Sequence, residues 1–391
     1  MVRGRWTLAV LVAPAVFTGT VHAQGDLPPA LGTPGVAGEV RTVNGRVMRG
    51  SGDAAEPVPG QVVVLHRIAA DSAGPVDSVR TSSSGAYRFR YTLDGPRSMY
   101  IVSARYAGVA YFSAPLREKD VSGPAAEVAV YDTTSTQFPL TIRARHVVIA
   151  PPQAGGLRQV VDVYEVSNDS ARTLVPGSSG TSWRLTLPGG ATNPASTGGD
   201  LPGDSFRFVD GVAELQVPFA PGSRQLVLTY FLPVESRVSM EVREPVSALE
   251  VLLEGTGSEI TGAGLVAEEP VSMEGRTFQR YRAANVSPGS SFAIQTAGAP
   301  GRGRLALLVV AGLAIALGIV LGRRATPQVI AAGTTATRPE SLAREIAALD
   351  HVYAAEGPRA GGGLRYYQER RAALLGQLVE AQAVEDRDSA T

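Results

Sequence analysis

The stretch Thr81–Tyr91, TSSSGAYRFRY, predicts a turn followed by a β-strand. Serine and glycine favour the turn, and after Gly85 two kinds of side chain alternate. The aromatic set is Tyr87, Phe89 and Tyr91, and the basic set between them is Arg88 and Arg90. Successive side chains of a strand point to opposite faces of a sheet. We therefore expect one buried aromatic face and one arginine-rich outer face.

Short apolar runs separated by turn residues continue on both sides of this strand. Asn44-Gly45 lies inside the first run, Pro57-Val58-Pro59-Gly60 precedes the valine-rich run 61–65, and residues 99–112 supply another. Several short strands with Pro and Gly between them are typical of an antiparallel sandwich. We predict a mainly β fold with two or three β-sandwich domains.

The order of these elements carries a resemblance to a known family. The matching features are Gly45-Arg46-Val47, the Pro57–Gly60 turn into a valine-rich strand, and Thr81…Gly85-x-Tyr87-x-Phe89. Residues 38–132 resemble the carboxypeptidase regulatory-like domain, a small seven-stranded transthyretin-like sandwich. The acidic residue that usually follows the threonine is Ser82 here. The resemblance implies an accessory or stabilising module that supplies no catalytic residues.

Strands are also predicted throughout residues 138–300. The run 140–149 alternates along its length and is expected to carry Arg143 and Arg145 on one face. Turns with Pro-Gly or Gly-Gly separate the later strands. These strands are expected at 160–166, 183–187, 206–208, 212–217, 225–232 and 248–253. One large sandwich, or two small ones that meet near Glu244-Pro245, accounts for this length.

The run Leu305–Leu321, LALLVVAGLAIALGIVL, has no charged side chain, and arginines flank it on both sides. At about 1.5 Å per helical residue it covers roughly 26 Å, close to the thickness of a bilayer core. A buried core helix is the alternative, but such helices rarely stay apolar on every face. We predict one transmembrane helix over residues 303–322.

Residues 1–23 have the layout of a secretory signal peptide, with Arg3 and Arg5 before an apolar run and a small-residue exit at Ala23. Cleavage after Ala23 is expected, and an uncleaved signal anchor is the alternative with the same sidedness. Residues 24–37 form a leader rich in Pro and Gly. The prediction is a single-pass inner-membrane protein, with most of the chain periplasmic or extracellular and a cytoplasmic C-terminus.

The composition limits the classes of function. The 391 residues include 36 basic and 36 acidic side chains, so no global charge recruits nucleic acid. The chain has no cysteine, which excludes disulfides, thiol nucleophiles and thiolate metal sites. Exported domains of this chain must therefore be held together by burial of their cores.

After a tether at residues 323–336, residues 337–391 predict a cytoplasmic helical hairpin. Thr337 and Glu340 have the spacing of a capping box, with Pro339 in the first turn. Apolar residues recur at helical spacing: Leu342, Ile346, Leu349 and Tyr353 on the first helix, and Leu364, Tyr367, Leu374 and Leu378 on the second. Two short amphipathic helices joined by a loop are expected to close on each other.

A second resemblance lies in this hairpin. The matching stretches are Glu345–Asp350 and, after a loop, Tyr367-x-x-Arg370-Arg371-Ala372-Ala373-Leu374. They resemble the short membrane-proximal hairpin of bacterial cytochrome c biogenesis proteins of the haem-lyase accessory type. The usual acidic turn is replaced by three glycines, Gly361–Gly363. The resemblance implies an accessory role in cytochrome c maturation or haem handling, and Tyr367, Arg370 and Arg371 are candidate contacts.

Titratable side chains do not converge on a catalytic site. The histidines that remain after the signal peptide are His66, His146 and His351, and no His-x-x-His spacing occurs. Asp200, Asp204 and Asp210 lie in one Gly/Pro-rich loop, so calcium binding or hydrolysis there is an alternative. We predict that the protein is not an enzyme and has no catalytic residue, cofactor or metal.

The remaining candidates are surfaces. Arg88 with Arg90, and Arg143 with Arg145, could receive an acidic partner or lipid headgroups, and a solvated sheet face is the alternative. We predict a membrane-anchored periplasmic binding or scaffold protein without enzymatic activity. Its expected partners are the bilayer, a protein, peptide or glycan outside, and a membrane or cytoplasmic protein at the hairpin. An accessory factor in cytochrome c maturation or haem handling is the alternative function.

Overall fold

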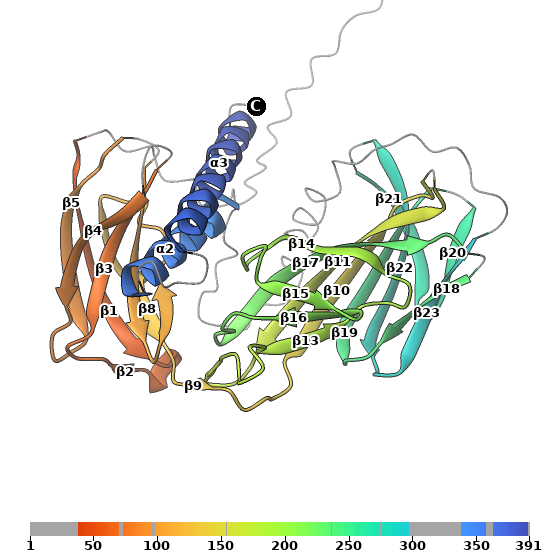
Figure 1. Cartoon of the computed structure of the whole chain (residues 1–391), viewed down its shortest axis with the longest axis horizontal. Coiled ribbons are helices and arrows are strands. Elements are labelled where there is room, and N and C mark those ends of the chain that lie inside the picture. Colours follow the sequence, from red (N-terminus) through yellow and green to blue (C-terminus); the bar gives the residue numbers. More distant parts are fainter. Residues whose placement is uncertain are drawn as a thin grey trace, which may run out of the picture. The chain divides into compact units, whose positions relative to one another are not determined.

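Figure 1 shows the computed structural model of the chain. It describes residues 38–69, 73–95, 98–153, 155–235, 237–255, 257–273, 275–296, 338–356 and 363–389. These residues are mainly β-strands, followed by two C-terminal helices, as predicted. The expected signal peptide (1–23), leader (24–37), transmembrane helix (303–322) and tether (323–336) lie outside the described residues. Within the described ranges, no helix is long and apolar enough to cross a membrane.

Two four-stranded sheets form the first β unit. In one sheet, β1 pairs with β2 and β5 antiparallel and with β8 parallel. Its strands are β1 (Val40–Arg49), β2 (Glu56–Pro57), β5 (Ala86–Thr92) and β8 (Asp120–Val130), and a 3-10 turn, η1 (Gly52–Ala54), precedes β2. The other sheet has the order β4-β3-β6-β7, with β3 (Val62–Ile68), β4 (Ala73–Arg80), β6 (Met99–Tyr106) and β7 (Val109–Phe112).

One hydrophobic core lies between these two sheets. Inward side chains come from both, including Val43, Val47, Tyr87, Phe89 and Val128 from the first sheet and Val63, Leu65, Tyr100 and Val102 from the second. Each fully buried aliphatic or aromatic side chain contributes about 1.5–3 kcal/mol relative to exposure. The aromatic residues of β5 are buried and its two arginines are exposed, as the alternation predicts.

Gly45 allows the strands to approach each other at the centre of this unit. The Tyr87 hydroxyl donates a hydrogen bond of 2.5 Å to the carbonyl oxygen of Ala126. A Cβ atom on residue 45 would lie 2.1 Å from that oxygen and 2.3 Å from the Tyr87 ring. Contacts this short do not occur between real atoms, so only glycine fits.

The second β region is built on one seven-stranded sheet with the order β14-β17-β11-β10-β19-β22-β21. Its strands are β10 (Thr141–Ile149), β11 (Leu157–Asn168), β14 (Thr192–Gly199), β17 (Gly222–Pro233), β19 (Val246–Glu254), β21 (Val266–Met273) and β22 (Arg276–Val286). Parallel pairing of β10 with β19 joins the strands on either side of Glu244-Pro245. Both halves of the second region therefore share one sheet.

Two three-stranded sheets pack on the inner face of this sheet. They are β13 (Trp183–Thr186), β16 (Val212–Leu215) and β15 (Phe206–Val209), and β18 (Arg237–Val242), β23 (Ser290–Thr296) and β20 (Ser258–Gly262). One core cluster includes side chains of all three sheets, among them Leu185, Leu215, Tyr230, Met240, Val251 and Ile294. A two-stranded sheet joins β9 (Thr133–Thr134) to β12 (Thr173–Leu174).

The C-terminal helices α2 (Arg338–Glu356) and α3 (Gly363–Ser389) pack on each other. Leu342, Ile346, Leu374 and Leu378 are buried, in agreement with the helical spacing. The same cluster contains Ile68 of β3 and Ile101 of β6. Tyr353 and Leu364 are also expected on this apolar face, but their side chains are outside the described ones.

We expect Gly45→Ala to lower the free energy of unfolding by about 3 kcal/mol, because the added methyl group overlaps a backbone oxygen that cannot rotate away. Gly189→Ala is the matched control, because its Cβ would meet nothing within 4 Å. Urea denaturation followed by circular dichroism measures both. Equal midpoints for the two variants would contradict the packing described for Gly45.

Candidate functional site

A buried ion pair lies inside the seven-stranded sheet. The Nε and Nη2 atoms of Arg145 donate to the two carboxylate oxygens of Asp162 at 3.0 and 2.7 Å. Their side chains are 5% and 1% exposed. Tyr164 and Tyr230 each donate a hydroxyl hydrogen bond of 2.9 Å to Asp162 Oδ2. Asp162 thus accepts four hydrogen bonds from side chains on three neighbouring strands.

A change of register brings Arg145 into the core. The pairing of β10 with β11 shifts between Ile142 and Ala144, which is a β-bulge or a related irregularity. Such an irregularity interrupts the alternation of faces along a strand. Arg143 is consequently exposed and 2.8 Å from Asp169, whereas Arg145 points inward. The expectation that both arginines share an exposed face is therefore corrected for Arg145.

The protonation states of this network follow from its burial. Burial disfavours the charge of Arg145, but Asp162 together with Tyr164 and Tyr230 outweighs that effect, so the pKa of Arg145 lies well above its ordinary value. Burial, reinforced by Asp162, raises the pKa of Tyr164 and Tyr230 well above the usual value for tyrosine. The guanidinium therefore stays charged and the two phenols stay protonated at neutral pH.

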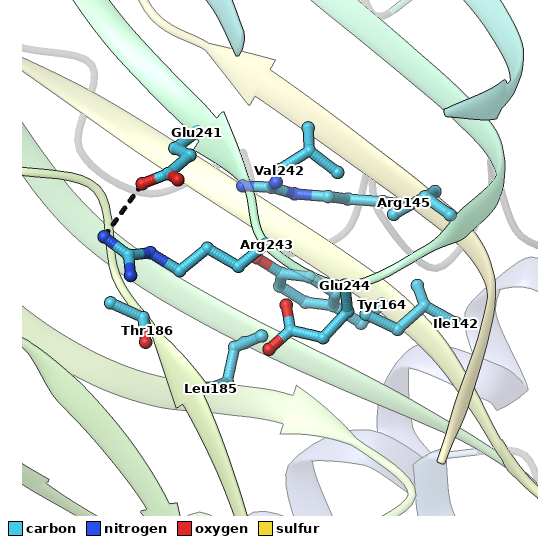
Figure 2. A pocket seen from close by; sticks show the side chains of 10 residues that line it. Ile142, Arg145, Tyr164, Leu185, Thr186, Glu241, Val242, Arg243 and Glu244 are labelled. Carbon is cyan, nitrogen blue, oxygen red and sulfur yellow. Dashed lines mark ion pairs between the residues drawn. The ribbon is translucent and has the colours of Figure 1, made fainter. Parts of the chain in front are cut away.

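A small pocket lies beside this network (Figure 2). Its lining consists of Ile142, Arg145, Tyr164, Leu185, Thr186, Glu241, Val242, Arg243, Glu244 and Val246. Burial raises the pKa of Glu244, although the nearby Arg145 acts in the opposite direction. Glu241 is paired with Arg243 at 2.8 Å. The raised pKa favours the protonated form of Glu244, and the Tyr164 hydroxyl is already bonded to Asp162.

A second charged cluster extends from β10 across β19 to β22. The Nδ1 atom of His146 lies 2.9 Å from Glu250 Oε2, and Arg280 Nε donates to Glu250 Oε1 at 2.6 Å. Burial alone would raise the pKa of Glu250, but hydrogen bonds and charge from His146 and Arg280 hold it below its ordinary value. One nitrogen of His146 is therefore already occupied by a carboxylate.

The three aspartates of the loop considered for calcium have separate surroundings, and Asp204 lies 3.3 Å from Arg370 Nη2. Asp200 accepts a hydrogen bond of 2.7 Å from the backbone nitrogen of Gln225, and Asp210 adopts a positive φ of 48° in the turn between β15 and β16. In the part of the chain that the structure describes, no three His, Cys, Asp or Glu side chains are placed to hold a metal ion.

The candidate contacts of the hairpin hold its two helices together. The Tyr367 hydroxyl and Arg371 Nε donate to Asp350 Oδ1 at 2.7 and 2.9 Å. Arg370 Nη2 donates to Glu345 at 2.6 Å and lies 3.3 Å from Asp204. Burial and the neighbouring Asp350 carboxylate raise the pKa of Tyr367 to about 12. These hydrogen bonds of Tyr367, Arg370 and Arg371 therefore connect α3 to α2.

The outer surface of β1 and β5 carries Arg46, Arg88 and Arg90, which we call the arginine face. All three side chains are exposed. Arg90 lies opposite Thr42, Arg88 opposite Asn44 and Arg46 opposite Ala86, so Arg88 is two rungs from each of the other two arginines. Glu127 of β8 is opposite Arg46. Among the described residues, none of the three arginines forms an ion pair.

Arginines on other exposed strands differ in this respect. Arg184 and Arg207 lie on either side of Glu214, 3.0 and 2.5 Å from its carboxylate oxygens. Hydrogen bonds from Arg207 and Arg184 hold the pKa of Glu214 below its usual value, although desolvation acts in the opposite direction. Arg88 and Arg90 therefore keep a positive charge that no ion pair within the described residues neutralises.

The sequence contained a signal for the buried pair that alternation alone did not reveal. Asp162 interrupts the apolar strand Val160–Val166 at a position that shares its face with Tyr164. A carboxylate on a core face requires a buried partner. That partner could not be identified from spacing, because the register shift between Ile142 and Ala144 decides which residue of β10 faces inward.

Comparisons with known proteins yield little. No protein-family model matches the chain, and no curated protein sequence matches it. The chain has a partial likeness to crystal structures of an M1 zinc metallopeptidase from Deinococcus radiodurans. A single-residue mutant has 10% identity and a TM-score of 0.30, and the match covers 41% of this chain and 43% of the enzyme. The unmutated enzyme has 10% identity, the same coverage and a TM-score of 0.29. The chain thus spans less than half of that enzyme, and so low a score supports no inference about fold or activity.

We expect Asp162→Asn to lower the free energy of unfolding by about 3–5 kcal/mol, because it leaves Arg145 buried without a counter-charge. Urea unfolding followed through the fluorescence of Trp183, which lies in the same region's core, measures the change. The control Asp169→Asn removes the partner of exposed Arg143 and should cost about 1 kcal/mol or less. Equal losses for the two variants would contradict the importance of the buried pair.

Proposed function

We propose that the protein is an exported, membrane-anchored binding or scaffold protein without enzymatic activity, and that its arginine face binds an extended acidic polymer. The observation that carries this proposal is the unpaired positive charge of Arg88 and Arg90 on an exposed strand. Guanidinium groups form strong charge-assisted hydrogen bonds with carboxylates.

The geometry of the arginine face favours a chain-like partner over a small ion. Arg88 and Arg90 are two residues apart on one strand, which separates them by about 7 Å. Both side chains are exposed on the outside of a sheet. An acidic peptide or a glycan with uronic acids presents carboxylates at repeated intervals and can contact several arginines together.

We further propose the envelope topology that the sequence patterns indicate. Residues 1–23 serve as a signal peptide, residues 303–322 span the inner membrane and residues 337–391 lie in the cytoplasm. Residues 38–132 are proposed to be a carboxypeptidase regulatory-like module that presents the arginine face outside. In this topology a bilayer would lie between the hairpin and the first β unit, so the buried cluster that the hairpin shares with Ile68 and Ile101 could not form in the membrane-anchored chain.

Binding of the full chain, in neutral-lipid nanodiscs, to poly-glutamate and to polygalacturonate tests the arginine face. Replacement of both Arg88 and Arg90 by Gln should weaken binding about tenfold, and added salt should weaken wild-type binding because the site is exposed. The control Arg184→Gln with Arg207→Gln removes the same charge from paired arginines and should change binding less than about twofold.

Two results would count against this partner. Equal losses for the two double variants would show that net charge, and not the arginine face, governs binding. Binding to vesicles of anionic phospholipid, together with none to either polymer, would replace the acidic polymer by a lipid surface.

The topology is tested with cysteines, which the chain lacks. We expect Ile101→Cys and Ile346→Cys, combined in one chain, to resist joining by a short bis-maleimide in intact membranes, because the proposed span separates them. The control is the same pair in a chain without residues 303–322, where the contact in the buried cluster should allow joining. Efficient joining in membranes would place both segments on one side and overturn the single-span proposal.

A further inference from the structure

Arg158 is a fully buried cation near the start of β11. Its side chain is 1% exposed and is among the largest fully buried side chains in the described ranges. Arg158 is separated from Asp162 and Tyr164 of the same strand by even numbers of residues, so it shares the inner face of the seven-stranded sheet with them. Its Nη2 atom reaches β23 and donates to Thr296 Oγ1 at 3.0 Å.

The other donors of this guanidinium lack an acceptor. The Nε and Nη1 atoms of Arg158 are buried and form no hydrogen bond. The contrast with Arg145 is informative, because that buried guanidinium has a bidentate carboxylate partner. A buried unpaired ion is strongly destabilising, so a folded protein normally supplies a counter-charge.

Thr296, the residue that Arg158 contacts, also has a donor available. Thr296 Oγ1 accepts from Arg158 and, through a long contact of 3.5 Å, from the Ser258 hydroxyl. Its lone pairs are therefore occupied, and its own hydroxyl proton remains available for donation. The site thus combines a positive charge with several N–H and O–H donors, which is the chemistry that holds an anion.

We propose that Arg158 and Thr296 bind a small inorganic anion of the halide class, enclosed between β11 and β23. Nη2 belongs to both edges of the planar guanidinium fork, so an anion on either edge lies beside the Thr296 hydroxyl. The near-complete burial of Arg158 limits the ligand to a small ion that is enclosed as the sheets close. Such an ion would secure the last residue of β23 to the seven-stranded sheet.

Chloride is the probe, and the thermal unfolding midpoint of the full chain in detergent is the readout. Ionic strength is kept constant by exchanging gluconate for chloride, so that the arginine face experiences the same screening throughout. We expect the midpoint to rise with chloride and to gain about 5 °C when chloride is about 100 times its dissociation constant. Arg158→Met should abolish this gain, whereas the control Arg143→Met, at an exposed and paired arginine, should retain it.

A second variant and a direct measurement keep the test decisive if Arg158→Met does not fold. Thr296→Val keeps the shape of the side chain but removes the hydroxyl, and should raise the chloride concentration needed for half of the gain at least threefold. Crystals grown in bromide should show anomalous scattering beside the guanidinium of Arg158. A midpoint that does not respond to chloride, or an anomalous map without a peak there, would overturn the anion site. Neither result affects the arginine face, which lies in the other β unit.

Discussion

The pairing of Arg145 with Asp162 is the constraint around which the second β region is organised. A buried charge loses its hydration, and only a well-oriented partner and further hydrogen bonds compensate for that loss. Asp162 meets this requirement by accepting from Arg145, Tyr164 and Tyr230 on β10, β11 and β17. A slip of one residue in either pairing would turn a charged group to the wrong face, so the network reinforces the register of three strands.

Arginine is found in four distinct physical situations in this chain, in which Lys119 is the only lysine. Some arginines are neutralised inside the protein, as Arg145 is, and others are paired at the surface, as Arg184 is. The arginine face is exposed and forms no ion pair within the described residues, and it is the surface at which we propose that an acidic polymer binds. Arg158 is buried and only partly bonded, so no described carboxylate compensates its charge. These last two situations are the ones that point to ligands, one at the surface and one inside.

The two candidate arginine pairs differ in how far the sequence predicts their exposure. Arg88 and Arg90 are exposed, as predicted, because β5 pairs with β1 without interruption and the alternation persists. Arg145 is buried although Arg143 is exposed, because the register of β10 shifts between them. In the hairpin, the apolar stripe was predictable from helical spacing, but the use of Tyr367 and Arg371 to join α3 to Asp350 depends on how the helices are aligned.

The sequence by itself determined the mainly β class, most strand positions and the two C-terminal helices, because alternation, helical spacing and turn residues act over a few neighbouring positions. Only the tertiary structure decided which charges are buried and what they bind. The partners that settle this are 17 residues apart for Arg145 and Asp162, 104 for His146 and Glu250, and 138 for Arg158 and Thr296. The burial of a charged side chain depends on how the sheets pack, so it cannot be predicted from the pattern of neighbouring residues.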